Sequence, residues 1–60
     1  MAGKFELYQD KAGEWRFRLK AANGEVIASG QGYASKSGAQ GGIESVRRNA
    51  ADAEVVEVDA

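Results

Sequence analysis

The residues best suited to chemistry in this chain are three alternating cations, Arg16, Arg18 and Lys20. Their alternation places them on one face of a strand, and Tyr8 of the preceding strand is expected beside them. Positive charge next to an aromatic ring is typical of surfaces that bind single-stranded nucleic acid. Against this, Glu6 is predicted to lie opposite Arg18, and the net charge of −1 provides no general attraction to nucleic acid. A solvated polar face is the simpler interpretation, and nucleic-acid binding is the alternative.

A second candidate is the start of the predicted helix, where Ser35, Lys36 and Ser37 follow the segment GQGYAS. Free amides at a helix start, with these side chains, could hold a phosphate or a carboxylate. The two glycines of the segment are a near miss to a dinucleotide fingerprint, but the third glycine is missing and a hairpin precedes the segment. The simpler interpretation is that Ser35 is an N-cap, which accepts a hydrogen bond from the first turn.

Catalysis is the function that the composition supports least. The chain has no cysteine and no histidine, which removes thiolate chemistry and the commonest metal ligand. The remaining carboxylates include Asp10, Glu14 and Glu25 near turns and Glu44 on a helix surface, and no pair is spaced for acid–base work. We therefore expect no catalytic residues, no metal site and no cofactor.

Helical periodicity is clear only in the stretch that follows Tyr33, and it predicts a helix over about residues 36–49. Ala39, Ile43 and Val46 recur at spacings of four and three, which is one face of a helix. Glycine within a helix costs about 0.5–1 kcal/mol relative to alanine. Gly42 lies beside the apolar face, so we expect it to allow a close approach to the sheet.

The first half of the chain predicts a hairpin between strands at about residues 4–9 and 14–21. Gly13 stands in the third position of a three-residue loop, where a left-handed residue is needed. With Asp10 paired to Glu14, turn chemistry and the alternation of apolar residues select the same register. The inward-facing residues of these strands are then Phe5, Leu7, Trp15, Phe17 and Leu19.

A third strand is predicted at about residues 25–33, after a two-residue turn at Asn23 and Gly24. The turn sets Ala22 opposite Glu25. The expected pairs are Ala21 with Val26, Leu19 with Ala28, Phe17 with Gly30 and Trp15 with Gly32, which places Val26 and Ala28 in the core.

After the helix, residues 51–53 are a connector and a strand is predicted at about residues 54–58. Val56 and Val58 lie on one face of this strand and Val55 on the other. An unpaired, valine-rich edge strand is an aggregation hazard, so we expect the segment to pair with an edge of its own sheet or of a partner's sheet.

Sixty residues make one domain, residues 1–60, and a chain of this size buries only about 60% of the surface that its unfolded form exposes. Small domains usually add disulfides, a metal or self-association. Without cysteine or histidine, self-association is the remaining way to stabilise the domain, and the candidate dimer contacts are Val55, Val56 and Val58. No apolar run approaches the roughly 20 residues that span a bilayer, so a cytoplasmic location is expected.

Two segments, FRLKAANGEVIASGQGY and SKSGAQGGIESVRRNA, resemble the YegP-like family of small prokaryotic domains. The combination of NGEVI, GY-x-SK and GI-x-SV-x-x-NA carries this resemblance, which covers about Lys4 to Ala50. It implies three strands, a helix and a further strand, and two such units that assemble about a two-fold axis with exchanged C-terminal strands. A single copy would then form a homodimer. The family offers no activity from which catalytic residues could be carried over.

The predicted fold is therefore α+β, a three-stranded antiparallel meander followed by one helix and a C-terminal strand (βββαβ), which assembles as a two-fold dimer with C-terminal strand exchange. The predicted role is that of a non-enzymatic interaction or structural module with an unidentified protein partner. Weak nucleic-acid binding through the basic sheet face is the alternative, and no membrane partner is expected.

Overall fold

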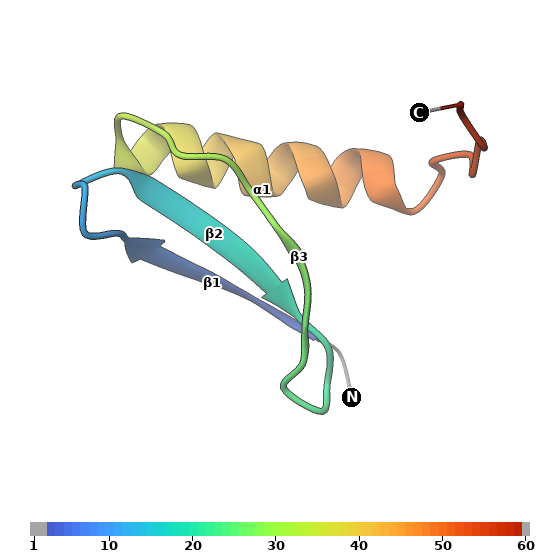
Figure 1. Ribbon diagram of the computed structural model, residues 1–60, viewed down its shortest axis with the longest axis horizontal. Helices are drawn as coiled ribbons and strands as arrows, with labels where there is room; N and C mark the ends of the chain where they lie inside the picture. The colour runs from blue at the N-terminus through green and yellow to red at the C-terminus, as the bar shows by residue number, and fades with distance from the viewer. Residues whose placement is uncertain (1–2, 60) are drawn as a thin grey trace.

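Three antiparallel strands form one sheet, and a single helix covers one of its faces in the computed structural model, which describes residues 3–59 (Figure 1). The elements are β1 (Lys4–Gln9), β2 (Trp15–Lys20), β3 (Val26–Ser29) and α1 (Lys36–Ala50). The order in the sheet is β1-β2-β3, so β2 is central and both of its neighbours are edge strands. The predicted α+β architecture of three antiparallel strands and one helix is confirmed.

The β1–β2 hairpin has the register that its turn chemistry and apolar pattern predict. Asp10 N donates to Glu14 O at 2.9 Å, and Gly13 adopts the left-handed conformation with φ of 86°. The Asp10 carboxylate also accepts from the backbone N–H groups of Ala12 and Glu14. Leu7 lies opposite Phe17, and the other predicted pairs of this hairpin are also present.

The β2–β3 hairpin differs from the prediction by one residue at its turn. Ala21 N donates to Glu25 O at 2.8 Å, so the loop has three residues and Gly24, with φ of 90°, takes the left-handed position. A bulge between the pairs of Leu19 and Lys20 then absorbs the extra residue. The loop geometry therefore repeats that of the first hairpin, and the predicted two-residue turn is wrong.

Beyond the bulge the predicted register returns and is then lost again. Observed pairs include Leu19 with Ala28, as predicted, and Lys20 with Val26 instead of Ala21 with Val26. Gly30 N donates to Phe17 O, but Trp15 exchanges backbone hydrogen bonds with Tyr33, not with Gly32. The third strand is consequently shorter than predicted, because it contains one extra, unpaired residue on each side of its central pairs.

Helix α1 begins where the sequence places its cap. The Ser35 side chain, in extended backbone conformation, accepts from Gly38 N at 3.0 Å. Within residues 3–59 the helix packs against β1 and β2 and makes no comparable contact with β3. Its apolar side meets the sheet at Ala39, which is fully buried.

The core is small and centres on the ring of Phe17. Phe17 is 5% exposed and Ala39 is 0% exposed, and they are the buried hydrophobic residues of the described chain. The Phe17 ring stacks on Tyr33 with 6.2 Å between ring centroids. A Cβ added to Gly30 or Gly42 would collide with this pair of rings. The other core candidates that are half-buried are Phe5, Leu7, Trp15, Leu19, Ile43 and Val46.

Two residues that were expected in the core are exposed in the single chain. Val26 is 50% exposed, and Ala28 also faces solvent. The cause is the position of the helix, which lies over β1 and β2 and leaves β3 uncovered. All four residues of β3 are exposed, including Ile27 at 59%.

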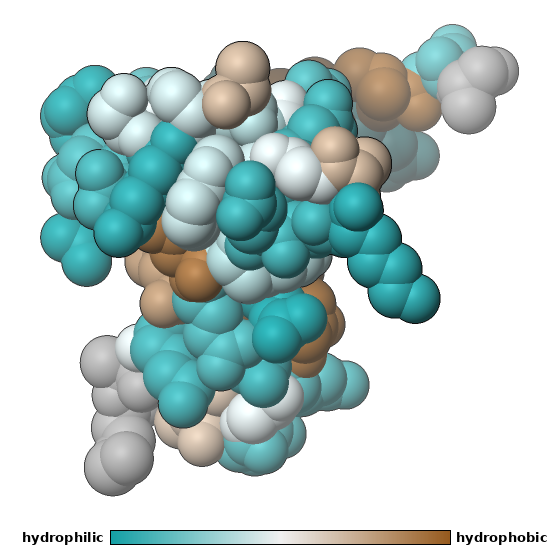
Figure 2. Space-filling view, turned by 90° about the vertical axis from the view of Figure 1, so that its left-hand side faces the viewer, coloured by the Kyte–Doolittle hydropathy of each residue, from teal (hydrophilic) through white to brown (hydrophobic). Residues whose placement is uncertain are grey.

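The predicted strand at about residues 54–58 is not formed within the single chain. Residues 53–59 have no regular secondary structure, and they extend beyond the C-terminal end of α1 (Figure 1). The exposed fractions are 98% for Val55, 63% for Val56 and 77% for Val58. Figure 2 shows the hydrophobic surface of this tail standing apart from the main body. Within residues 3–59 the sheet therefore does not pair with the tail of the same chain.

The two adjacent helix glycines should respond in opposite directions to alanine. At Gly42 an added Cβ would meet the Tyr33 hydroxyl and, at 3.1 Å, the Phe17 ring, whereas at Gly41 it would meet nothing within 4 Å. We expect Gly41→Ala to raise the free energy of unfolding by about 0.5–1 kcal/mol. Gly42→Ala should lower it by about 1 kcal/mol, because overpacking costs about 1–3 kcal/mol against the same helical gain.

Urea unfolding of both variants measures these free energies, and Gly41→Ala is the matched control for helix propensity. Equal stabilisation by both substitutions would show that the Tyr33 ring moves aside freely and that Gly42 has no packing role.

Candidate functional site

The outer face of the sheet, on the side away from α1, carries the basic row that the sequence analysis singled out. The β1–β2 register brings an acidic residue of β1 or of the turn to each cation. Arg16 Nε donates to Asp10 Oδ2 at 2.6 Å, and Arg16 Nη2 lies 3.6 Å from a Glu14 carboxylate oxygen. Arg16 is therefore paired at the turn end of the row.

Glu6 gathers the other cations of this face. Its carboxylate accepts from Arg18 Nε at 2.7 Å and lies 3.3 Å from Lys20 Nζ. Lys4 Nζ is 3.9 Å away on the same strand. One carboxylate thus serves three neighbouring cations, in an arrangement that the antiparallel register dictates.

These contacts lower the pKa of both acids. The pKa of Glu6 lies below its usual range, first because Arg18 donates a hydrogen bond to the carboxylate and next because Lys20 does. The pKa of Asp10 is also lowered, by the hydrogen bond from Arg16 and then by that from Glu14 N. Both carboxylates stay ionised at neutral pH and remain paired with the cations of the row.

The aromatic member of the row is also engaged. The Arg18 guanidinium carbon lies 4.7 Å from the centroid of the Tyr8 ring, within cation–π distance. Tyr8 is half-buried. The structure thus brings Tyr8, Arg16, Arg18 and Lys20 together as predicted, but as a closed set of ion pairs and a ring contact. A platform for stacked bases needs open rings and unpaired cations, which this face lacks within residues 3–59.

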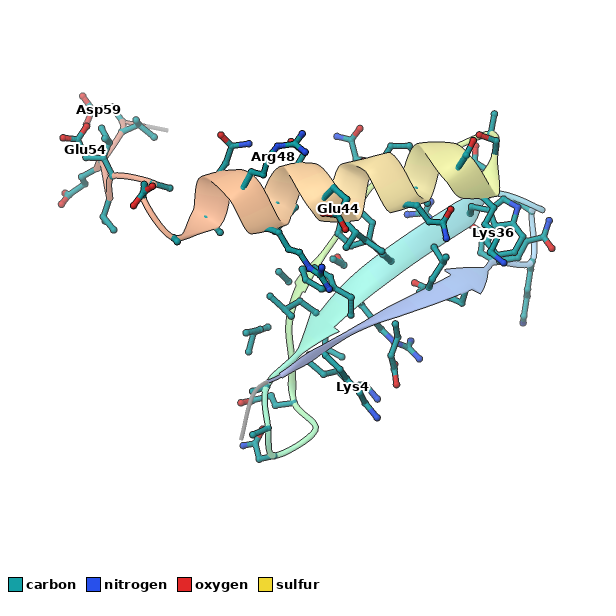
Figure 3. The ribbon with its side chains drawn as sticks, turned by 180° about the vertical axis from the view of Figure 1, so that it is seen from behind. Lys4, Lys36, Glu44, Arg48, Glu54 and Asp59 are labelled. Atoms are coloured by element: carbon teal, nitrogen blue, oxygen red, sulfur yellow. The ribbon has the colours of Figure 1, made fainter. Side chains whose placement is uncertain are left out.

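The second candidate, at the start of α1, is occupied by its own contacts. The Ser35 hydroxyl caps the helix and lies 3.3 Å from that of Ser37. Lys36 turns back over the sheet, with its ammonium nitrogen 5.8 Å from the centroid of the Trp15 ring (Figure 3). The capping role of Ser35 accounts for this cluster without a bound anion.

Sequence reasoning missed the double role of Asp10. One of its carboxylate oxygens accepts two backbone hydrogen bonds within the turn, and the other holds Arg16. The signal was present, because aspartate at the first position of such a turn commonly bonds to the backbone two residues on. The face-by-face alternation of the strands does not include this turn residue, which is why the pairing with Arg16 was not predicted.

The described chain offers no other recognisable centre. Within residues 3–59 no three carboxylates are grouped closely enough to hold a metal ion. None of the helical segments in that range has the length and apolar character required to cross a membrane. What the fold defines is a small α+β domain whose polar face is internally ion-paired and whose third strand is uncovered.

Residues 10–57 match the family described as Domain of unknown function (DUF1508). The chain belongs to this family, and the predicted YegP-like resemblance is confirmed. A curated protein from Treponema denticola, called UPF0339 protein, is 69% identical over 58 residues, which cover 97% of this chain and all of that protein. The family description assigns no function.

Two further comparisons concern the fold and the length. A solution structure of a protein from Haloferax volcanii is 50% identical, with a TM-score of 0.86, and covers 95% of this chain and 97% of that one. A UPF0339 protein from Stutzerimonas stutzeri is 60% identical over 52 residues. Those residues are 87% of this chain but 47% of the relative, so the chain spans about half of that protein's length.

The ion pairs of Glu6 predict an acid-sensitive contribution to stability. A carboxylate whose pKa is lowered by folding stabilises the fold above its unfolded pKa, and this contribution is lost as the pH falls through the folded pKa. We expect Glu6→Gln to lower the thermal midpoint at pH 7, and we expect the difference from the parent chain to vanish in strong acid.

Thermal unfolding followed by circular dichroism across this pH range measures both effects. Glu25→Gln is the matched control, because Glu25 is an exposed glutamate without an ion pair in the described chain. A pH-independent difference for Glu6→Gln would mean that its effect arises from packing and not from charge.

Proposed function

We propose that this chain is a non-enzymatic interaction module that functions as a homodimer, in which each copy adds its C-terminal strand to the sheet of the other. The observation that carries the proposal is that one chain contains both an uncovered edge strand, β3, and a valine-rich tail without a neighbouring strand in the described residues. An uncovered edge strand and an unpaired strand-forming tail are each unfavourable alone, and each supplies what the other lacks.

Strand β3 supplies the acceptor edge of this proposal. Its outward backbone N–H and C=O groups have no neighbouring strand, because β3 is last in the sheet order. Its four residues are exposed, and Val26 and Ile27 offer apolar surface there. Strand β1, the other edge, is less suited, since Phe5 and Leu7 are already half-buried and the helix lies above it.

The tail supplies the donor strand. Val55, Val56 and Val58 are β-branched, and β-branched residues favour extended backbone. Their alternation gives the added strand one face with two valines and one with a single valine. The family match runs as far as residue 57, so most of the tail belongs to the shared domain. An expendable extension would not be expected to fall inside that match.

The length of one relative supports a unit made of two copies. The Stutzerimonas stutzeri protein has room for a second domain of this size, since 52 matched residues make up 47% of it. A tandem pair in one chain and a dimer of single copies are equivalent ways to bring two such units together. We extend this arrangement to the present chain as a homodimer.

The same proposal assigns the dimer a cytoplasmic location and a protein partner, and no cofactor. The grounds are the absence of cysteine and histidine from the sequence and a polar sheet face whose charges are already paired. An ion-paired face of this kind suits contact with another protein surface better than it suits acid–base chemistry, which needs an unsatisfied or protonated group near neutral pH.

Light scattering should find a mass twice the 6.4 kDa of one chain at micromolar concentration. We expect Val56→Asp with Val58→Asp to give a monomer, because charge on the inward side of an added strand would be buried without a partner. Deletion of residues 54–60 should have the same effect. The thermal midpoint of the parent chain, but not of these variants, should rise with protein concentration.

Gln40→Asp with Gly41→Asp is the control, since it adds the same charge at two exposed helix positions. A parent chain that remains monomeric would overturn the proposal. A dimer that survives both tail variants would place the interface elsewhere.

Filter binding to single-stranded RNA tests the alternative function. We expect no retention of RNA by the parent chain at low salt, because Arg16 is paired with Asp10, and Arg18 and Lys20 are paired with Glu6. Glu6→Gln releases two of these cations and should produce weak retention that disappears as salt is raised. Salt-sensitive binding by the parent chain itself would instead assign the outer face to nucleic acid.

A further inference from the structure

The charge of this chain is divided sharply between its body and its tail. All eight basic residues lie within residues 1–50, together with five of the nine acidic residues, so the body carries a net charge of +3. The other four acidic residues lie within residues 51–60, where no basic residue stands, and this tail carries −4. The overall charge of −1 therefore conceals two oppositely charged parts.

The acidic groups of the tail form no ion pair in the part of the chain that the structure describes. Within residues 3–59, neither Glu54, Glu57, Asp52 nor Asp59 makes an ion pair. Figure 3 shows Glu54 and Asp59 beyond the end of the helix that carries Arg48, with Lys36 at the other end. A helix of 15 residues is about 22 Å long, more than twice the Debye length of about 10 Å at 0.1 M salt.

Some cations of the body are also unpaired. Within the described range, Lys11, Lys36 and Arg48 take part in no ion pair, and all three are exposed. Glu25 is the corresponding unpaired acid, so the body keeps an excess of unpaired positive charge. Lys11 and Lys36 lie at the same end of the molecule, because Lys36 contacts Trp15 just after the turn that contains Lys11.

We infer that the acidic tail is an electrostatic docking segment whose binding surface is the basic body of a second copy of this chain. The inference rests on the proposed homodimer and concerns what brings its two halves together. Each dimer places two tails of −4 against two bodies of +3, which is a complementary arrangement even though each whole chain is slightly negative. The valines then complete the contact once the tail lies along β3.

Complementary charge of this kind has a measurable consequence. It accelerates encounter between partners and makes association weaker as salt rises, whereas burial of valines alone does not respond in that direction. The net charge of the chain predicts the opposite behaviour, because two copies of −1 would repel and added salt would help them associate. The sign of the salt effect therefore separates the two cases.

Sedimentation equilibrium of the full chain, at about 0.01 M and about 1 M salt, tests this inference, because these salt concentrations set Debye lengths near 30 and 3 Å. Glu54→Gln with Glu57→Gln removes two tail charges and should raise the dimer dissociation constant on the order of tenfold at low salt. Glu25→Gln with Glu44→Gln removes the same charge from the body and should leave the dimer unchanged or tighter. At high salt the three proteins should converge.

Each outcome either supports or overturns the docking inference. Weakening by the tail substitutions alone, together with loss of the difference at high salt, supports electrostatic docking. A dimer on which tail and body substitutions act alike overturns the inference and leaves the homodimer standing. A chain that is monomeric at both salt concentrations overturns the homodimer and the docking inference together.

Discussion

The ring of Phe17 can be buried only because two glycines leave room around it. Gly30 lies beside the ring in the sheet, and Gly42 lies above it in the helix, and neither site could take a Cβ without collision with Phe17 or with Tyr33, which stacks on it. This contact fixes the height and position of α1 over the sheet. With Ala39 it provides the fully buried part of a core that is otherwise half-exposed.

The position of the helix determines what the rest of the chain can do. Gly42 and Ala39 bring α1 close to the Phe17 ring, and within residues 3–59 the helix packs against β1 and β2 and makes no comparable contact with β3. A helix with its side chains is about 10 Å across and neighbouring strands lie about 4.8 Å apart, so one helix covers about two strands. A single helix over three strands leaves one edge strand exposed, and in this fold that strand is β3.

The first hairpin was predictable because local and non-local signals agree in it. The third position of the loop needs a left-handed residue, and Gly13 supplies it. The alternation of apolar residues from Phe5 to Leu19 selects the same register. The second hairpin lacked such agreement. Asn23 and Gly24 fit a two-residue turn, and Gly24 equally fits the third position of a three-residue loop. Because a bulge restores the predicted register, both loops lead to the same central pairs. Sequence alone could not choose, because the correct loop is distinguished only by backbone pairing.

The candidate site shows the same division. The basic row and its neighbour Tyr8 followed from alternation, but Asp10 belongs to a turn, where alternation says nothing about side-chain direction. The tail shows a different limit, since its valines predict a strand, but within residues 3–59 neither edge strand lies beside them. A strand is defined by its neighbour as much as by its own residues. Where the neighbouring strand belongs to another molecule, its position is indicated by what one chain leaves uncovered and unpaired. Here these features are the exposed β3, the projecting valines, and the division between a positive body and a negative tail that begins at Ala51.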